Sequence, residues 1–237
     1  MTDNAIEKAV MVCPFLCAQS SIQKKQITAV TGLFLILFVL GHLAGNLFIY
    51  LGHEAFNGYA QKLAGLRPGL YLVETVLLLI FLIHLYLTAL LVWENRQARP
   101  VAYRQWQMIG EHSIASRLMP WTGTVIIAFV VWHLRDFTFA DGDGPRSILS
   151  DGQSYGLYGV VYNAFADPWH SALYILAMAA LGFHLSHGIQ SFAQTLGFYH
   201  PRYTPLIRKM SNGLGLLIAL AYSSIPAAVA LGCLAVR

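Results

Sequence analysis

The stretch "LFVLGHLAGNLFIYLGH", residues 37–53, decides the fold, because it places the imidazole of His42 inside a run that is otherwise apolar enough for lipid. An ionisable ring inside a membrane span is costly and usually marks a functional site. The function of this ring depends on whether other histidines lie at matching depths on other helices.

The composition assigns the whole chain to the membrane. Of its 237 residues, 57% are hydrophobic and only 11% are charged, whereas soluble domains carry about 25% charged residues. The cysteines Cys13, Cys17 and Cys233 show neither a CxxC pair nor a zinc-binding spacing. We therefore expect membrane lipid as the surroundings, no iron–sulfur site in this chain and no nucleic-acid partner.

Five segments are long and apolar enough to cross a bilayer, which takes about 20 residues. They are residues 27–51, 70–94, 118–139, 168–196 and 206–234. The expected fold is therefore an all-α membrane protein in which four helices form a bundle and one is peripheral. We expect an N-terminal segment at 1–26 on the cytoplasmic side and a five-helix transmembrane domain at 27–234.

The distribution of positive charge predicts the orientation of these helices. With the N-terminus inside, ten Lys and Arg residues fall on inner segments and five on outer ones. Because positive charge is concentrated on cytoplasmic loops, we expect a multi-pass protein of the cytoplasmic membrane. Its N-terminus would be cytoplasmic and its C-terminus would lie on the outer side.

Four of the nine histidines lie well inside these segments, and they fall into two layers. At a rise of about 1.5 Å per residue, His42 and His133 lie about 9–12 Å below the outer boundary. By the same count, His84 and His184 lie about 20–22 Å deep. Two imidazoles at one depth on opposing helices are typical of haem ligation within a helical bundle. The pattern predicts two b haems, an outer one on His42 and His133 and an inner one on His84 and His184.

Two other interpretations of these histidines stay open. A single intramembrane histidine can be a hydrogen-bonded packing residue or part of a proton path. His187 lies one turn beyond His184 and is a rival ligand, although it is too close to the inner surface to match His84 well. The glycines beside the predicted ligands, Gly41, Gly45 and Gly182, would give a macrocycle clearance, although membrane helices also use glycine for packing.

The chain resembles the cytochrome b membrane anchor of succinate dehydrogenase and fumarate reductase, of the single-subunit, five-helix, di-haem type. The matching stretches are "TGLFLILFVLGHLAGNLFIYLGHEAFNGYAQKL", "HLYLTALLVWENRQARPVAY", "SRLMPWTGTVIIAFVVWHLRDFTF" and "FHLSHGIQSFAQTLGF". The resemblance implies the same four haem ligands in the same pairing. It also implies a flavoprotein subunit, an iron–sulfur subunit and a membrane quinone, menaquinone in di-haem members, as partners.

One position departs from some fumarate-reducing relatives. These carry an acidic residue two positions before the ligand on the fourth helix, as part of a proton route. In this chain that position is Gly182. We therefore do not expect proton transfer along that helix.

Quinone reduction needs hydrogen-bond partners and a proton supply near an aqueous face, and haem propionates need cationic or hydroxyl partners. The predicted quinone contacts are His53, Glu54 and Arg67 on the outer side, and Gln26 and His112 on the inner side. The predicted contacts to haem propionates are Thr28, Ser116, Arg117, Arg135 and His187. Arg135 and Asp136 could instead form an ion pair at the membrane surface.

The function predicted from these observations is the quinone-reactive membrane anchor of a succinate:quinone oxidoreductase, with the dicarboxylate chemistry in its partner subunits. One alternative is the cytochrome b anchor of a hydrogenase or formate dehydrogenase. A second alternative is a proton-coupled transporter that uses histidines as relays. Transporters tend to show broken helices or internal repeats, and neither is evident in this sequence.

Overall fold

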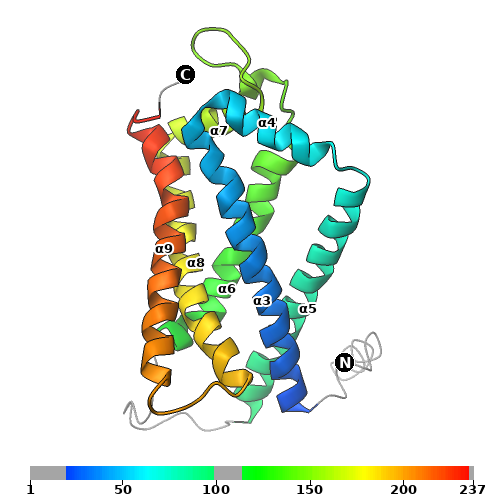
Figure 1. The fold of residues 1–237 in the computed structure, drawn as a ribbon, viewed down its shortest axis with the longest axis vertical. Helices are drawn as coiled ribbons and strands as arrows, with labels where there is room; N and C mark the ends of the chain where they lie inside the picture. The colour runs from blue at the N-terminus through cyan, green and yellow to red at the C-terminus, as the bar shows by residue number, and fades with distance from the viewer. Residues whose placement is uncertain (1–19, 99–113, 235–237) are drawn as a thin grey trace, which may run out of the picture.

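Five long helices run between the two ends of the molecule (Figure 1) in a computed structural model that describes residues 20–98 and 114–234. They are α3 (Ser21–Asn46), α5 (Gly69–Gln97), α6 (Ile114–His133), α8 (Pro168–Thr195) and α9 (Thr204–Ala230). All five are long and apolar enough to cross a membrane. The all-α fold and the five spans expected from the sequence are thereby confirmed.

Short irregular helices extend two of these spans at the end of the bundle that the charge distribution predicts to lie outside, which we call the outer end, the opposite end being the inner end. α3 continues into the 3-10 helix η1 (Leu47–Leu51), and α6 continues into the π-helical turn η2 (Leu134–Thr138). A π turn inside a helix is rare and frequently occurs at a functional site. η2 begins directly after His133, so the widened turn adjoins a predicted ligand.

Local capping explains where the spans begin. Ser20 and Gln23 form a capping box at the start of α3, in which the Ser20 hydroxyl accepts from the Gln23 amide and the Gln23 side chain accepts from the Ser20 amide. α3 therefore begins before residue 27, the start expected from hydropathy. Asp167 caps α8 through the Trp169 amide, and Pro168 occupies the first turn.

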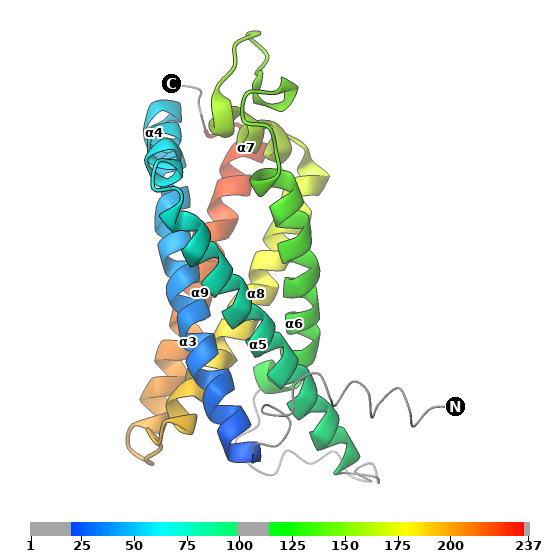
Figure 2. The same cartoon turned by 90° about the vertical axis from the view of Figure 1, so that its right-hand side faces the viewer.

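The packing order of the helices defines an interior. α3 packs against α5 and α8, α6 packs against α8, and α9 packs most extensively against α8. Figures 1 and 2 show α9 at the edge of the bundle, beside α8, so that α3, α5, α6 and α8 surround the interior. In this arrangement α3 lies across the interior from α6, and α5 lies across from α8.

α8 and α9 are in backbone contact, which requires glycine on both helices. A Cβ at Gly182 would lie 2.9 Å from the Gly215 carbonyl oxygen, and a Cβ at Gly215 would lie 2.6 Å from that of Gly182. Small residues allow this close approach in membranes, where burial of apolar surface gives little driving force.

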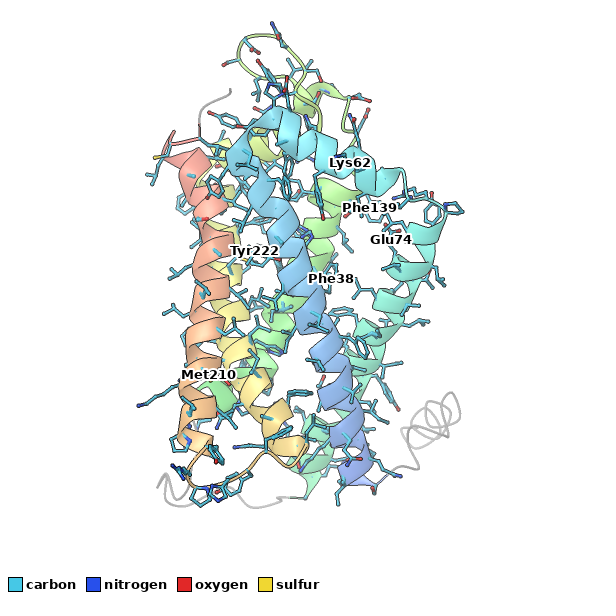
Figure 3. The ribbon with its side chains drawn as sticks, viewed as in Figure 1. Phe38, Lys62, Glu74, Phe139, Met210 and Tyr222 are labelled. Atoms are coloured by element: carbon cyan, nitrogen blue, oxygen red, sulfur yellow. The ribbon has the colours of Figure 1, made fainter. Side chains whose placement is uncertain are left out.

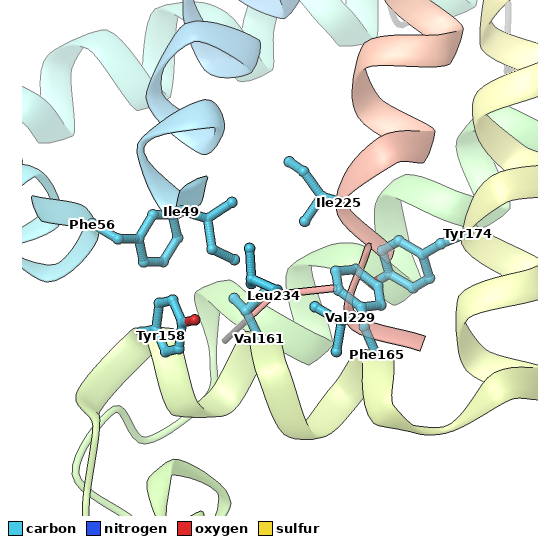
Figure 4. Close-up of a cluster of buried hydrophobic side chains, with 9 residues drawn as sticks. All are labelled: Ile49, Phe56, Tyr158, Val161, Phe165, Tyr174, Ile225, Val229 and Leu234. Carbon is cyan, nitrogen blue, oxygen red and sulfur yellow. The ribbon is translucent and has the colours of Figure 1, made fainter. Parts of the chain in front are cut away.

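The outer end carries two further helices that the sequence did not reveal. α4 (His53–Ala64) lies across the end of the bundle, and α7 (Gly156–Ala166) precedes α8 after the short η3 (Pro145–Ser147). Both lie between the segments predicted to cross the membrane. Their side chains build the main buried hydrophobic cluster together with the ends of α3, α8 and α9 (Figure 4). Its members are Ile49, Phe56, Tyr158, Val161, Phe165, Tyr174, Ile225, Val229 and Leu234.

Away from that cluster, large apolar side chains point outward along the spans. Leu72, Leu78 and Leu82 on α5 are exposed, as are Leu216 and Leu220 on α9. An apolar surface this extensive would be a liability in water, whereas acyl chains solvate it in a bilayer. The outward leucines therefore mark the lipid-facing surface.

Candidate functional site: paired histidines within the bundle

The outer pair joins α3 to α6 across the interior. The rings of His42 and His133 are nearly perpendicular, at 87°, and their centroids lie 5.7 Å apart. An imidazole nitrogen lies about 2 Å from a bound transition metal, so two rings on opposite sides of one ion have centroids about 6 Å apart. The observed separation fits axial ligation from both sides.

Aromatic rings enclose this outer pair. Phe38 stacks on His42 at 5.4 Å, and the Tyr222 ring lies 6.2 Å from the same histidine. Figure 3 shows Phe38 on α3 and Tyr222 on α9. Phe129 and Phe137 lie 5.5 Å and 5.3 Å from His133. The outer pair is thus surrounded mostly by the planar side chains of aromatic residues.

The inner pair lies on α5 and α8, the other two opposed helices. Nδ1 of His84 lies 3.1 Å from the Thr31 hydroxyl and 3.2 Å from the Thr28 carbonyl oxygen, both on α3. Nδ1 of His184 lies 3.2 Å from the Thr122 hydroxyl on α6. Each inner ring is therefore held by a neighbouring helix through its Nδ1 atom.

The chemistry of these donors fits a macrocycle better than a bare metal ion. Within the described residues, no group of three or more His, Cys, Asp or Glu side chains could hold a metal, whereas structural sites for bare ions such as zinc use four protein ligands. A haem supplies four nitrogens of its own and needs only the two axial ligands that a histidine pair provides. Nδ1 of His133 is also buried without a hydrogen-bond partner among these residues.

Some of the side chains predicted to contact haem propionates lie at the inner end of the bundle. The Thr28 hydroxyl and Nδ1 of His187 are buried and have no hydrogen-bond partner within the described part of the chain. Both have the polarity to bind a carboxylate. Arg117 is exposed near the start of α6, while the side chain of Ser116 lies outside the described residues.

At the outer end, Asp136 turns inward instead of pairing with its neighbour Arg135. Its carboxylate accepts a 2.8 Å hydrogen bond from the Tyr174 hydroxyl. Nε2 of His170 lies 3.0 Å from the same oxygen, an ion-pair distance without the angle of a hydrogen bond. Arg135 itself is exposed, and Arg146 donates to the Asp136 backbone carbonyl. The expectation of an Arg135–Asp136 ion pair is not met among the described residues.

The predicted outer quinone contacts lie at opposite ends of α4. His53 begins α4, with its ring edge-on to Tyr155 at 5.0 Å, and Glu54 follows it as an exposed residue. Arg67 lies beyond the other end, 3.6 Å from Glu74 and over the Tyr71 ring. The 12 residues of α4 span about 18 Å, so the structure does not bring His53 and Arg67 into one site.

At the inner end, Gln26 is exposed on α3 and His112 lies outside the described residues. The sequence prediction missed an ion pair near Gln26, between Lys24 on α3 and Glu94 on α5. The Lys24 side chain is only 6% exposed and that of Glu94 is 32% exposed, so the ammonium is buried and the carboxylate is partly exposed. The separation of 70 positions between the partners left no local pattern that could have revealed it.

The glycines expected to clear space for a macrocycle serve mainly other purposes. Gly182 is occupied by the contact with α9, and a Cβ at Gly45 would lie 2.7 Å from the Tyr59 ring. The glycines that do lie against predicted ligands are Gly32, beside His84, and Gly123, beside His184. Each follows one of the threonines that contact Nδ1, and this repeated Thr-Gly pair was the available sequence signal.

The five spans define a multi-pass membrane protein, and histidines on opposed helices of a bundle are the arrangement expected of the cytochrome b class. The chain belongs to the succinate dehydrogenase/fumarate reductase transmembrane subunit family, whose model matches residues 94–221. It is similar to the succinate dehydrogenase cytochrome b558 subunit of Bacillus subtilis (strain 168), at 27% identity over 190 residues that cover 79% of this chain and 84% of that protein. No solved structure matches the chain. The chain is therefore a membrane anchor subunit of an oxidoreductase complex.

Proposed function

We propose that this chain carries two b haems and transfers electrons between an iron–sulfur subunit on the cytoplasmic side and a quinone in the membrane. The observation that supports this most directly is the pairing of four intramembrane histidines on opposed helices, at two depths. The family supports a succinate dehydrogenase or fumarate reductase complex over a hydrogenase, a formate dehydrogenase or a transporter.

In this proposal His42 and His133 would hold the outer haem, and His84 and His184 would hold the inner haem. A bound haem b supplies a reversible one-electron centre. The histidines fix its depth and orientation, and the aromatic rings around the outer pair exclude water. Thr28 and His187, whose buried polar atoms have no hydrogen-bond partner among the described residues, would bind a propionate of the inner haem together with Arg117.

We place the end of the molecule that carries the α8–α9 connection on the cytoplasmic side, in accord with the positive charge expected there. The inner histidine pair is then the nearer one to the iron–sulfur and flavoprotein subunits. Electrons would pass between these partners and the outer pair along the bundle axis. The C-terminus and the α4 and α7 helices would face the outer side.

The quinone, menaquinone by resemblance, needs proton donors and acceptors near one aqueous face. His53 is the predicted contact of interest on the outer side, because its ring contacts Tyr155 and also Tyr158, a member of the buried cluster. The buried Asp136, with Tyr174 and His170, lies one turn beyond His133. These groups favour the outer end over the exposed Gln26 as the place of quinone chemistry.

The proposal is tested by purifying the complex through a tag on this chain. We expect a flavoprotein and an iron–sulfur protein to co-purify, with a reduced-minus-oxidised spectrum of two b haems per chain and succinate:quinone reductase activity. A nickel or molybdenum subunit in their place would contradict the proposed complex. A folded chain that binds no haem when porphyrin is supplied would contradict the ligand assignment.

A further inference from the structure

Two Thr-Gly pairs lie within the spans, and each faces a histidine of a neighbouring helix. Thr31 and Gly32 on α3 face His84 on α5, and a Cβ at Gly32 would lie 3.3 Å from its Cε1 atom. Thr122 and Gly123 on α6 face His184 on α8, and a Cβ at Gly123 would lie 3.6 Å from its Cε1 atom. The same contact between a Thr-Gly pair and a histidine thus occurs twice, once for each histidine of the inner pair.

The hydroxyl proton of each threonine is already committed to its own helix. Thr31 Oγ1 lies 2.8 Å from the Ile27 carbonyl oxygen and 3.0 Å from that of Thr28. A carbonyl oxygen can only accept a hydrogen bond, so the Thr31 hydroxyl donates to its helix. The remaining lone pairs of Thr31 Oγ1 therefore face His84 as acceptors.

The same argument applies to Thr122. Its Oγ1 lies 3.0 Å and 3.2 Å from the carbonyl oxygens of Leu118 and Met119. The hydroxyl again has two carbonyl acceptors on its own helix, and its lone pairs face His184. In both cases the histidine has to be the donor.

This donor assignment determines the tautomer of both rings. A neutral imidazole carries one proton, and if Nδ1 carries it then Nε2 keeps a free lone pair. The Thr28 carbonyl oxygen, 3.2 Å from Nδ1 of His84, strengthens the assignment, because it too can only accept. A histidine that binds a metal through one ring nitrogen commonly donates a hydrogen bond from the N–H of the other. This hydrogen bond orients the ring and raises the basicity of the metal-binding nitrogen.

Resting on the proposed haem ligation, we propose that Thr31 and Thr122 are positioning residues that accept hydrogen bonds from Nδ1 of His84 and His184. They fix Nε2 of each ring as the metal-binding nitrogen and increase the basicity of both inner ligands. The glycine after each threonine lets the ring approach its helix closely. The outer pair differs, because Nδ1 of His133 has no hydrogen-bond partner among the described residues.

The test compares Thr31→Val and Thr122→Val with the corresponding serine variants in the purified complex. Valine keeps the shape of threonine without the hydroxyl, whereas serine keeps the hydroxyl. Redox titration followed optically reports the midpoint potential of each haem, and low-temperature EPR reports the axial ligand geometry. Neither readout depends on turnover.

Loss of the Nδ1 hydrogen bond makes the ligand less basic and weakens binding of the oxidised iron relative to the reduced iron. We expect Thr122→Val to raise the inner midpoint potential by an amount equal to about a tenfold change in that ratio, or about 59 mV for one electron. Thr31→Val should raise it by less, because the Thr28 carbonyl still accepts from Nδ1 of His84. The outer potential should stay the same, and the serine variants should resemble the original protein.

Thr124→Val is the matched control. Thr124 also lies on α6 and donates to a backbone carbonyl, that of Pro120 at 2.9 Å, but no hydrogen bond joins it to a histidine within residues 20–98 and 114–234. It should leave both potentials unchanged, which separates the ligand contact from any effect of threonine on helix shape.

The outcomes distinguish this inference from the function on which it rests. Two haems with unshifted potentials in both valine variants would overturn the role of the threonines and leave the haem ligation intact. Loss of the inner haem from the valine variants but not from the serine variants would support the role of the two hydroxyls as acceptors. Loss of the inner haem from both kinds of variant would overturn that role. Absence of haem from the unmodified protein would instead overturn the proposed function.

Discussion

At the outer end of the bundle His42 and His133 lie among aromatic rings, whereas at the inner end His84 and His184 are held through Nδ1 by threonine. The outer end is also covered by α4 and α7 and by the main hydrophobic cluster. The inner end instead has a buried ion pair between α3 and α5. The same pair of side chains is thus placed in two different physical environments.

This difference separates two ways of holding a ligand. Ring contacts restrict the space available to an imidazole and exclude water, but they do not determine which nitrogen carries the proton. A hydrogen bond to Nδ1 determines both the ring orientation and the tautomer. Perturbations of the two ends should therefore have different consequences, and the following changes are ordered by expected effect.

The largest effect is expected from removing one ligand at each level. His42→Ala should abolish binding of the outer haem and leave the inner one, and His84→Ala should do the reverse, because each haem depends on its own pair. The optical spectrum and haem content per chain measure both results. His200→Ala is the control, because Nδ1 of His200 accepts from the Arg202 amide in a turn outside the spans, and loss of either haem from it would contradict the two-level assignment.

A smaller effect, confined at first to the inner end, is expected from Glu94→Gln. The variant leaves the buried ammonium of Lys24 without its counter-charge, and removing one partner of a buried ion pair costs about 3 kcal/mol. Because Lys24 and Glu94 join α3 to α5, the inner haem should be released before the outer one on heating in detergent. Replacing both residues by Met and Leu should recover most of the stability, and no recovery would show that the ion pair is not the cause.

Gly182→Ala tests the backbone contact between α8 and α9, which lies next to the predicted ligand His184 on α8. The added methyl group would meet the Gly215 carbonyl and the Ala219 methyl at under 3 Å, and overpacking of this kind costs about 2 kcal/mol. His184 lies half a turn further along α8, so inner haem occupancy should fall together with the unfolding temperature. Gly188→Ala is the matched control, since a Cβ there meets nothing within 4 Å in the described part of the chain, and an equal loss in both variants would contradict the packing argument.

The same contact explains why position 182 carries no acidic side chain. A carboxylate there would have to pass through the backbone of α9. The departure from the fumarate-reducing pattern is therefore also a packing requirement in this protein. A proton route along α8 would need a different residue.

The spans and the histidine pairing could be predicted because both depend on simple periodic quantities. Apolar length gives the spans, and a constant rise per residue gives the depth of His42, His84, His133 and His184. α4 and α7 could not be predicted in this way, because they are too short to cross a membrane and are stabilised by contacts at the end of the bundle. The partners of Lys24 and Asp136 depend on the rotation of each helix about its axis, which hydropathy does not determine.

The smallest effect is expected from Tyr222→Phe, which separates ring contacts from hydrogen bonds at the outer end. The Tyr222 hydroxyl donates to the Val39 carbonyl at 2.7 Å, while its ring lies 6.2 Å from His42. Phenylalanine keeps the ring and removes only the hydrogen bond, which should cost about 1 kcal/mol of stability. Because no hydrogen bond joins Tyr222 to the His42 ring in the described structure, the potential of the outer haem should not change. A shift as large as that expected for Thr31→Val would mean that the hydroxyls tune both ends and that the contrast between them is wrong.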